Sequence, residues 1–305
     1  MIGRTKKDIV ASVVIPSYRP GEGIFRCLNS ITHQNVDISF EIIVVDSSPK
    51  DLGDEIKAVF PEVQVIHLKQ RTLPGRARSL GASMAKGEIV FFTDSDCVVH
   101  KNWIKELCKI HQTGYPVAGG SVVNGTPKSV VGTAEYLLEF NEINPWAKPR
   151  EVRALPSCNF SVNKRIFEAV GFFPDFMKGE DTIFCERVVS LGERIFFHPK
   201  AKIVHENRKK LVFYLKNQIA LGEGALETRR RTKRHGHFLV NYPFFIPLVP
   251  VYRTLIIGKR LLKSHPRLFF SYLFHYPLIF LGLLVYTWGF IRGPYRSGLS
   301  TEPAR

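Results

Sequence analysis

The stretch Glu88-Ile-Val-Phe-Phe-Thr-Asp-Ser-Asp96 leads from an apolar run into two carboxylates spaced i, i+2. The run predicts a buried β-strand, and side chains two residues apart on an extended chain point the same way. Asp94 and Asp96 can therefore share one ligand. Their hard oxygen donors are suited to Mg²⁺ or Mn²⁺ bridging a diphosphate, because the ion neutralises charge on a leaving phosphate. Asp-x-Asp also occurs by chance in surface loops, so its position behind a strand is what favours the functional interpretation.

Short apolar runs alternate with amphipathic stretches on both sides of this segment. Strands are expected at residues 11–15, 40–45, 63–68, 89–93 and 116–119, and helices at 23–34, 51–59, 75–85 and 103–112. This alternation predicts an α/β fold with a mostly parallel central sheet. Such sheets bind ligands at the carboxyl ends of their strands, so the loops after residues 15, 45 and 93 are expected to carry the site.

Two of those loops read Val14-Ile-Pro-Ser-Tyr-Arg-Pro20 and Val44-Val-Asp-Ser-Ser48. A carboxylate at the end of a buried strand, here Asp46, can accept hydrogen bonds from a base or a ribose. It can equally cap the helix that follows, and the residues alone favour neither interpretation.

Further candidates lie on predicted helices and strand ends. Gly179-Glu-Asp181 opens a helix expected at 181–191, where carboxylates act as caps or as a general base. His205 is either a third metal ligand or a structural histidine at a strand end. Arg76 and Arg78 either pair with phosphate or line a solvated helix face. Helices are also expected at residues 130–140 and 164–170.

Charge and cysteine content narrow the class of protein. The chain has 305 residues and a net charge of +16, and residues 200–305 hold 19 basic but only 4 acidic side chains. Nucleic-acid binding is disfavoured, because the positive charge lies beside apolar runs and because that function would leave the motifs unexplained.

The cysteines are odd in number and widely spaced, which argues against a disulfide framework and a zinc site, and for a reducing compartment. They are Cys27, Cys97, Cys108, Cys158 and Cys185.

The C-terminal part changes character at about residue 238. Residues 268–291 contain no Lys, Arg, Asp or Glu and are long enough to cross a bilayer. Residues 238–258 are weaker, and the basic clusters at 229–234 and 259–267 favour one interfacial and one spanning segment. A buried helical hairpin is the alternative.

We expect a catalytic domain at 1–206, a basic helical connector at 207–237 and a membrane-associated tail at 238–305. The run at 9–15 is interpreted as a first strand, not a signal core.

Four ordered blocks resemble the family 2 inverting glycosyltransferases, which have the GT-A nucleotide-sugar fold, over roughly residues 11–206. The first two are Val13-Val-Ile-Pro-Ser-Tyr18 and Glu41-Ile-Ile-Val-Val-Asp46. The third is Gly75-Arg-Ala-Arg-Ser-Leu-Gly81 with the Asp-x-Asp, and the fourth runs from Asn159 through Gly179-Glu-Asp181 to His205.

The resemblance implies roles for individual residues. Donor-binding residues are, by this resemblance, Pro16, Ser17, Tyr18, Asp46, Arg78, Asp94 and Asp96. It places Asp94 near the ribose and implies that Asp96, with Asp94 and His205, holds Mn²⁺ or Mg²⁺. Asp181, with Glu180 beside it, is implied as the catalytic base.

Departures from the family pattern limit this interpretation. Ser47 and Ser79 stand where the family often has a carboxylate and an asparagine, which affects base and ribose recognition. No Gln-x-x-Arg-Trp follows His205, which points to transfer of one or a few sugars rather than processive synthesis.

The resemblance thus implies a metal-dependent inverting hexosyltransferase of the cell envelope. Its donor is a nucleotide-diphosphate sugar. The basic residues beside the apolar C-terminal segment predict, separately, a lipid-linked saccharide, lipid or glycan as the acceptor, and a membrane location with the catalytic domain on the cytoplasmic face. An inactive nucleotide-sugar-binding scaffold and a nucleotidyltransferase are the alternatives.

Overall fold

The computed structural model of the chain describes residues 10–232 and 236–296. Two compact units are defined by the contacts within each. Unit 1 consists of Met1–Ser121, Pro149–Asp175 and Phe184–Val204, and unit 2 of Val122–Lys148, Phe176–Ile183 and His205–Arg305. The three functional regions expected from composition stay a prediction. Ile9 of the first apolar run and Lys233 and Arg234 of the basic cluster lie outside the described residues.

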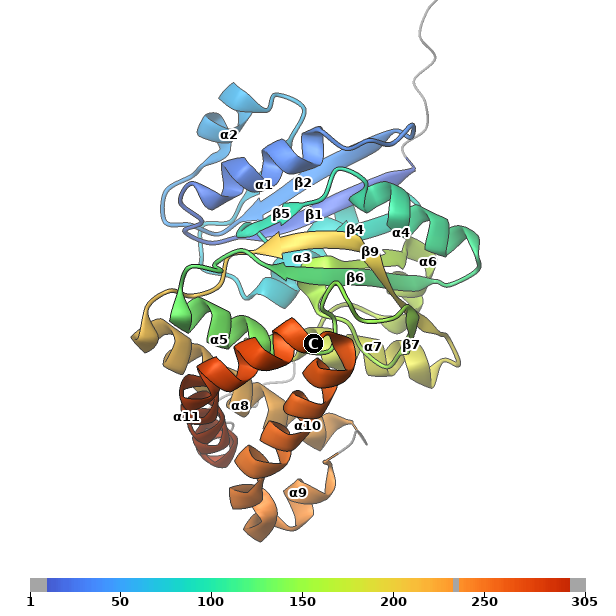
Figure 1. Cartoon of the computed structure of the whole chain (residues 1–305). Coiled ribbons are helices and arrows are strands. Elements are labelled where there is room, and N and C mark those ends of the chain that lie inside the picture. Colours follow the sequence, from blue (N-terminus) through green and yellow to red (C-terminus); the bar gives the residue numbers. More distant parts are fainter. Residues whose placement is uncertain (1–9, 233–235, 297–305) are drawn as a thin grey trace, which may run out of the picture. The chain divides into compact units, whose positions relative to one another are not determined.

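Unit 1 is built on a mixed sheet, drawn in the upper half of Figure 1, with the strand order β3-β2-β1-β4-β8-β6-β9-β5 and β7 paired with β9. The neighbours β1–β2, β2–β3 and β1–β4 are parallel, whereas β8 runs antiparallel to β4 and β6. The strands are β1 Ala11–Ser17, β2 Phe40–Asp46, β3 Gln64–His67, β4 Ile89–Phe92, β5 Cys97–Val99, β6 Val117–Asn124, β7 Arg150–Val152, β8 Phe160–Asn163 and β9 Ile195–His205.

The α/β architecture expected from the sequence is confirmed. The helices associated with the sheet strands are α1 Gly23–Thr32, α2 Gly53–Val59, α3 Pro74–Met84, α4 Trp103–Gln112, α6 Lys164–Val170 and α7 Glu180–Ser190, with a 3₁₀ turn η1 at Ser157–Asn159. Helix α3 packs directly on the parallel strands, because a Cβ atom at Gly81 would lie only 2.4 Å from Val14 Cγ1 and 3.2 Å from Val45 Cγ2. Gly81 therefore sets how closely α3 approaches the strands that end in the predicted site.

Aromatic side chains fill the core beneath the antiparallel part of the sheet. Phe92, Phe160 and Phe173 are in mutual ring contact, with centroids 5.3–6.4 Å apart. Asn159 is fully buried and ties three elements together: its Oδ1 accepts from Trp103 Nε1, and its Nδ2 donates to the carbonyls of Ser121 and Ala201. The buried amide thus joins α4 to the interior of β6 and of β9, which no local pattern would pair.

Unit 2 is helical, and its helices α8, α10 and α11 are drawn in orange to dark red in Figure 1. They are α5 Val130–Glu139, α8 Leu211–Arg231, α9 Phe238–Asn241, α10 Val249–Ser264 and α11 Pro266–Arg296, with a 3₁₀ helix η2 at Pro243–Leu248. Helix α11 packs against α8, α10 and α5. Within the described ranges, Pro266–Gly293 of α11 is the stretch long and apolar enough to cross a membrane, with a mean hydropathy of 1.9.

Candidate active site

The carboxyl ends of β1, β2 and β4 lie along one edge of the sheet, because these neighbouring strands are parallel. Ser17 at the end of β1 is in register with Asp46 at the end of β2, and Val14 is in register with Phe92 at the end of β4. The loops that follow carry the donor-binding residues implied by the sequence. Unit 1 thus brings these residues to the edge where parallel sheets bind ligands.

Asp46 organises two of these loops. Its buried carboxylate accepts hydrogen bonds from Ser17 Oγ and Ser48 Oγ at Oδ1, both at 2.8 Å. Its Oδ2 accepts from the backbone amide of Ser48 at 3.2 Å and lies 3.3 Å from Nδ1 of His67. Because two bonds on each oxygen use a carboxylate's acceptor positions, direct contact with a nucleotide would require exchange of one of them. The implied nucleotide contact of Asp46 stays a prediction.

The β1 loop beyond Pro16 presents an aromatic ring among cations. Tyr18 is exposed, and the guanidinium groups of Arg19 and Arg71 lie 5.4 and 4.8 Å from its ring centroid. Arg19 has a positive φ of 49°, and its backbone amide donates to Ser48 Oγ at 2.8 Å. The strained backbone is thus held by the residue that also bonds to Asp46, and the loop offers positive charge to an anionic ligand.

The two carboxylates of the Asp-x-Asp lie in different surroundings. Asp94 is paired with the buried Arg78 of α3, whose Nη2 is 2.5 Å from Asp94 Oδ1. Asp96 is exposed. The turn that carries them is tightly packed, because a Cβ atom at Gly23 would lie 2.9 Å from the carbonyl oxygen of Ser95. An exposed carboxylate on a fixed turn is a suitable hard donor for Mg²⁺ or Mn²⁺, so the residue present fits the implied metal.

Thiols near this turn do not add soft ligands. Burial and the carboxylates of Asp94 and Asp96 raise the pKa of Cys27 and of Cys97 well above the usual range. A thiol binds metal as the thiolate, and the raised pKa of both thiols disfavours that form. The chemistry of unit 1 therefore favours oxygen-binding cations over zinc.

Unit 2 contains the acidic pair, at the first turn of α7. Gly179 has φ of 93°, and a Cβ atom there would lie 2.5 Å from Thr228 Oγ1 of α8. Only glycine fits this turn without strain. Glu180 is 6% exposed and Asp181 is half-buried, with its Oδ1 accepting from the backbone amide of Thr182 at 2.6 Å. The turn thus fixes the direction in which α7 presents the implied base.

His205 ends β9 and is also held in place. Its Nδ1 lies 3.0 Å from Asn207 Oδ1, and the Asn207 amide donates to Asn124 Oδ1 at 3.0 Å. Since an amide oxygen only accepts, Nδ1 carries the proton and Nε2 carries the lone pair. That tautomer, oriented by a second residue, suits a metal-binding histidine.

The sequence reasoning missed a buried polar cluster on the same unit. Glu135 of α5 is 1% exposed and bonds to Arg208 and Asn217, while Glu139 Oε1 accepts from Asn217 and Gln218 at 2.7 and 2.9 Å. Burial, followed by the nearby charge of Glu135, raises the pKa of Glu139 to about 7. Two carboxylates at i, i+4 in an otherwise apolar helix were the signal that could have found it.

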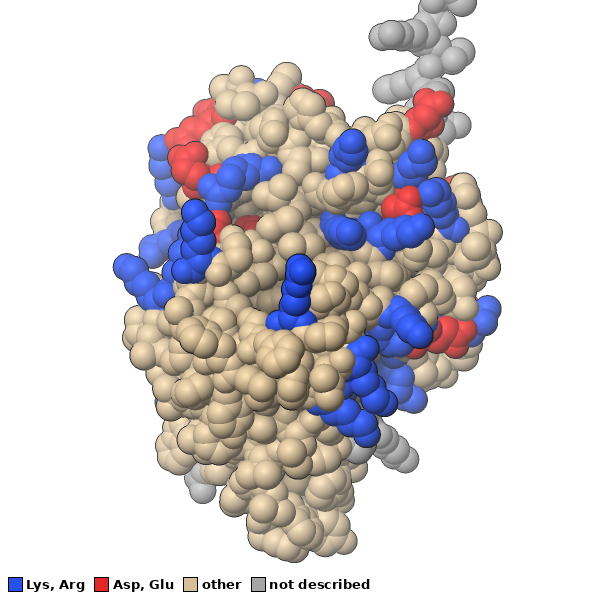
Figure 2. All heavy atoms as spheres, viewed as in Figure 1, with Lys and Arg blue, Asp and Glu red and all other residues tan. Residues whose placement is uncertain are grey.

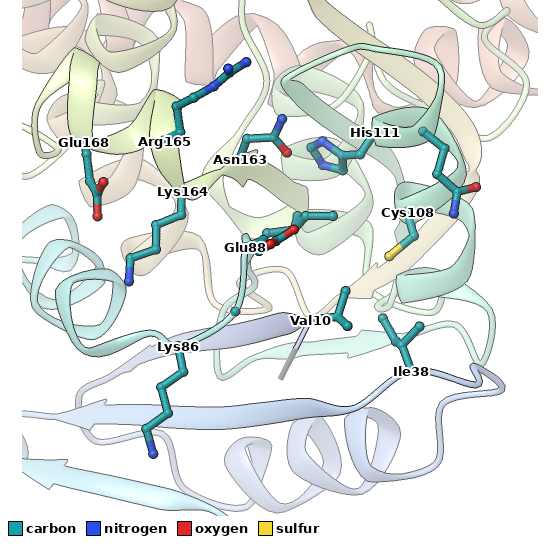
Figure 3. A pocket seen from close by; sticks show the side chains of 13 residues that line it. Val10, Ile38, Lys86, Glu88, Cys108, His111, Asn163, Lys164, Arg165 and Glu168 are labelled. Carbon is teal, nitrogen blue, oxygen red and sulfur yellow. The ribbon is translucent and has the colours of Figure 1, made fainter. Parts of the chain in front are cut away.

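A separate hollow of about 710 Å³ in unit 1 is shown in Figure 3. Its lining includes Val10 before β1, Glu88 before β4 and Asn163 at the end of β8. It therefore lies at the amino ends of β1 and β4. His111 on its wall has a pKa lowered to about 4 by burial, and its Nε2 lies 2.8 Å from Ser161 Oγ. The hollow is distinct from the sheet edge that carries the candidate donor residues.

This architecture, with carboxylates and an arginine at the carboxyl ends of parallel strands, defines the class of GT-A nucleotide-sugar transferases. Residues 12–171 match the family described as Glycosyl transferase family 2, so the chain belongs to that family. It is a glycosyltransferase that takes its sugar from a nucleotide-sugar donor.

Relatives agree with this assignment. The glycosyltransferase AglE of Haloferax volcanii is 28% identical over 224 residues, which cover 71% of this chain and 73% of that one. Polypeptide N-acetylgalactosaminyltransferase 12 of Mus musculus is 26% identical over 71% of this chain, which spans only 43% of that protein.

Solved structures show the same fold. A mannosyltransferase from Pyrobaculum calidifontis, in complex with GDP-Man and Mn²⁺, superposes with a TM-score of 0.63 at 16% identity, covering 97% of this chain and 89% of that one. GalNAc-T7 with UDP, GalNAc and Mn²⁺ gives a TM-score of 0.54 at 18% identity over 68% and 45% of the two chains.

Proposed function

We propose that this glycosyltransferase is a metal-dependent, inverting hexosyltransferase that adds one or a few sugars to a hydroxyl of a membrane-linked acceptor. The observation that carries the proposal is the different surroundings of the two carboxylates of the Asp-x-Asp. Asp94 is neutralised by Arg78, and Asp96 remains exposed as a donor for a divalent ion. Relatives of the same fold were solved with Mn²⁺, which supports the choice of metal.

The residues of unit 1 bind and orient the donor in this proposal. Tyr18 and the arginines around it face the nucleotide, and Ser17 with Asp46 keeps the two loops in place. Asp96, with Asp94 and His205 as the further implied ligands, would hold Mn²⁺ or Mg²⁺. When bound, the ion neutralises charge that develops on the departing diphosphate.

Asp181 accepts the proton of the attacking hydroxyl, and Glu180 beside it helps to set its position. The hydroxyl oxygen then bonds to the anomeric carbon as the bond to the diphosphate oxygen breaks. A single displacement of this kind inverts the anomeric configuration and requires no enzyme nucleophile.

The acceptor is proposed from the C-terminal part of the chain. Basic residues beside an apolar helix are drawn to anionic lipid on the cytoplasmic side of a membrane. A lipid-linked saccharide, a lipid or a membrane-bound glycan would reach the catalytic domain there. The absence of a processive-synthase motif after His205 supports a short product.

The test uses the detergent-solubilised full chain with Mn²⁺ and a panel of nucleotide sugars, with and without a membrane lipid extract. We expect release of nucleoside diphosphate from one donor, loss of release with EDTA, and an increase with lipid. Asp96→Ala and Asp181→Asn should each lower turnover by about 10²–10⁴-fold, whereas Asp54→Asn on the exposed surface of α2 should not.

Three outcomes would contradict the proposal. Near-native turnover by both variants would show that these carboxylates do not perform the reaction. A product with the same anomeric configuration as the donor, read by NMR, would exclude single displacement. Metal-dependent nucleotide binding without transfer to any acceptor would favour the scaffold instead.

A further inference from the structure

Helix α11 has two different apolar faces. One is buried and includes Tyr272, Ile279, Leu283 and Phe290. The other is exposed and repeats at helical spacing. It consists of Phe270, Leu273, Phe274, Leu281, Leu284, Trp288 and Ile291, which are 37–74% exposed. No described residue of unit 2 covers this open side, and an exposed apolar face of this size is typical of an interaction site.

The buried face is fastened closely to α8. A Cβ atom at Gly222 of α8 would lie 2.0 Å from the carbonyl oxygen of Tyr286, and one at Gly289 of α11 would lie 2.2 Å from that of Ile219. At the middle of α11, Tyr214 of α8 donates to the carbonyl of Leu278 at 3.1 Å. Since backbone meets backbone along this crossing, α11 belongs to the folded body of unit 2.

Charged side chains lie against the C-terminal half of α11. Arg253 of α10 lies 4.3 Å from the ring centroid of Tyr286, and Arg292 lies 4.0 Å from Glu223 of α8. Helix α5 also packs against α11, and its buried Glu135 is paired with Arg208, which precedes α8. If α11 crossed a bilayer in this packing, these charges would enter hydrocarbon, at a cost of several kcal/mol for each unshielded ion. The packing therefore opposes the spanning segment expected from hydropathy.

The elements next to α11 continue the open apolar surface and add positive charge. Phe244 of η2 and Leu255 of α10 are 70% and 67% exposed. The exposed cations Lys259, Lys263 and Arg267 lie at the end of α10 and the start of α11. Residues 228–301 contain no Asp or Glu, and Figure 2 shows no red on the surface over α9 and α10. The carboxylates beside α10 and α11, Glu142 and Glu223, are paired with Arg260 and Arg292. The charge along this apolar face is therefore positive on balance, which matches an anionic lipid surface.

We propose that η2, α10 and α11 dock in the plane of an anionic bilayer surface, with no helix crossing it. Phe244, Leu255 and the open face of α11 enter the boundary between headgroups and acyl chains. Lys259, Lys263 and Arg267 contact the lipid phosphates. This mode of attachment deepens the proposed membrane location and does not depend on which sugar is transferred.

Binding is tested by flotation of the full chain with phosphatidylcholine vesicles that contain or lack about 30% phosphatidylglycerol, an anionic lipid. We expect flotation with the anionic vesicles and weak flotation without them. Phe270→Asp/Phe274→Asp should abolish flotation, and Lys259→Gln/Lys263→Gln/Arg267→Gln should weaken it by about 100-fold. The control is Val59→Asp, at an exposed apolar position of α2 in unit 1, which should float like the parent chain.

The in-plane arrangement is tested by labelling single cysteines with an impermeant maleimide, after the protein has been added to sealed vesicles. The parent is Cys108→Ser, because the other four cysteines are buried. Lys263→Cys precedes α11 and Arg292→Cys lies in its last turns, and both should be labelled before lysis. Labelling of one of them only after detergent would overturn the proposal and restore a spanning helix.

A second copy of the chain is the competing occupant of this face. The lipid assignment would be overturned if the chain did not float and formed a dimer in solution that Phe270→Asp/Phe274→Asp converts to a monomer.

Release of nucleoside diphosphate is measured on the same variants with a soluble acceptor analogue. A variant that no longer floats but still releases nucleoside diphosphate would show that lipid docking and sugar transfer are separate properties. An unsubstituted chain that floats but releases no nucleoside diphosphate would contradict the proposed function and leave the docking proposal intact.

Discussion

The guanidinium of Arg78 lies 2.5 Å from Oδ1 of Asp94, so the protein itself neutralises the first carboxylate of the Asp-x-Asp. Arg78 comes from α3 and is 3% exposed, whereas the Asp94 side chain is 29% exposed. The cation is thus the buried member of the pair. Helix α3, set close to the sheet by Gly81, delivers this charge to the β4 turn.

Arg78→Met should lower the free energy of unfolding by about 2–4 kcal/mol, since removal of one partner leaves the other uncompensated. It should also weaken binding of a nucleoside diphosphate with Mn²⁺ by about tenfold or more, because the exposed charge of Asp94 would then repel the diphosphate. Urea unfolding and calorimetric titration measure the two effects. Arg76→Met, an exposed neighbour on α3, is the control. Equal behaviour of the two variants would show that the ion pair is unimportant.

Asp46→Asn should disconnect the β1 and β2 loops. An amide at this position places an NH₂ group where Asp46 now accepts bonds, so at least one of its donor partners loses its acceptor. We expect a loss of about 1–3 kcal/mol in unfolding free energy. The nucleotide affinity should fall as well, because Tyr18 and Arg19 follow directly in the β1 loop. Asp54→Asn is the matched control, and an unchanged urea midpoint for Asp46→Asn would refute the bracing role.

The parallel half of the sheet could be predicted because its strands are buried on both faces and therefore read as continuous apolar runs. Strands β1, β2 and β4 and their terminal carboxylates were found in this way, and helix α4 was predicted with its observed bounds. Strands β5 and β7 were missed, because three residues are too few to show a period. Strand β8 was missed because its four residues are defined by antiparallel pairing with distant segments.

Side-chain partners across the fold were beyond reach for the same reason. Nothing local in the sequence indicates that Arg78 pairs with Asp94, or that Asn159 joins Trp103 to the backbone of β6 and β9. Glu139 could have been suspected as a carboxylate on an apolar helix. Its partners Asn217 and Gln218 are almost eighty residues away, so its protonation could not be inferred. Hydropathy also identified α11 as a candidate span without revealing that Arg253 of α10 and Glu223 of α8 lie against it.

Gly222→Ala should loosen the crossing of α8 and α11. The added Cβ atom would meet the backbone carbonyl of Tyr286 at 2.0 Å, and backbone cannot rotate away as a side chain can. We expect a loss of about 1–3 kcal/mol from overpacking. The control is Gly258→Ala in α10, where the nearest atom is Tyr272 Cε1 at 3.4 Å and alanine adds helix propensity. Urea unfolding compares the two, and a stabilised Gly222→Ala variant would contradict the close packing.

Glu139 should make the folded chain more stable at acidic pH than at neutral pH. Its pKa is raised to about 7 by burial and by Glu135, above the 4.5 of an ordinary glutamate. Below pH 4.5 the folded and unfolded states both hold the proton, so no penalty exists. As the pH rises to 7, the unfolded state ionises first, and folding loses about 2–3 kcal/mol. Glu139→Gln keeps the site neutral, so this variant should become more stable than the wild type, by up to that amount, as the pH rises from 4.5 to 7.

Unfolding free energies measured by urea titration across this pH range provide the test. The control is Glu168→Gln, at an exposed position of α6, whose unfolding free energy should vary with pH in parallel with that of the wild type. If the unfolding free energy of Glu139→Gln also ran parallel to the wild type, the buried carboxyl would not titrate near neutral pH.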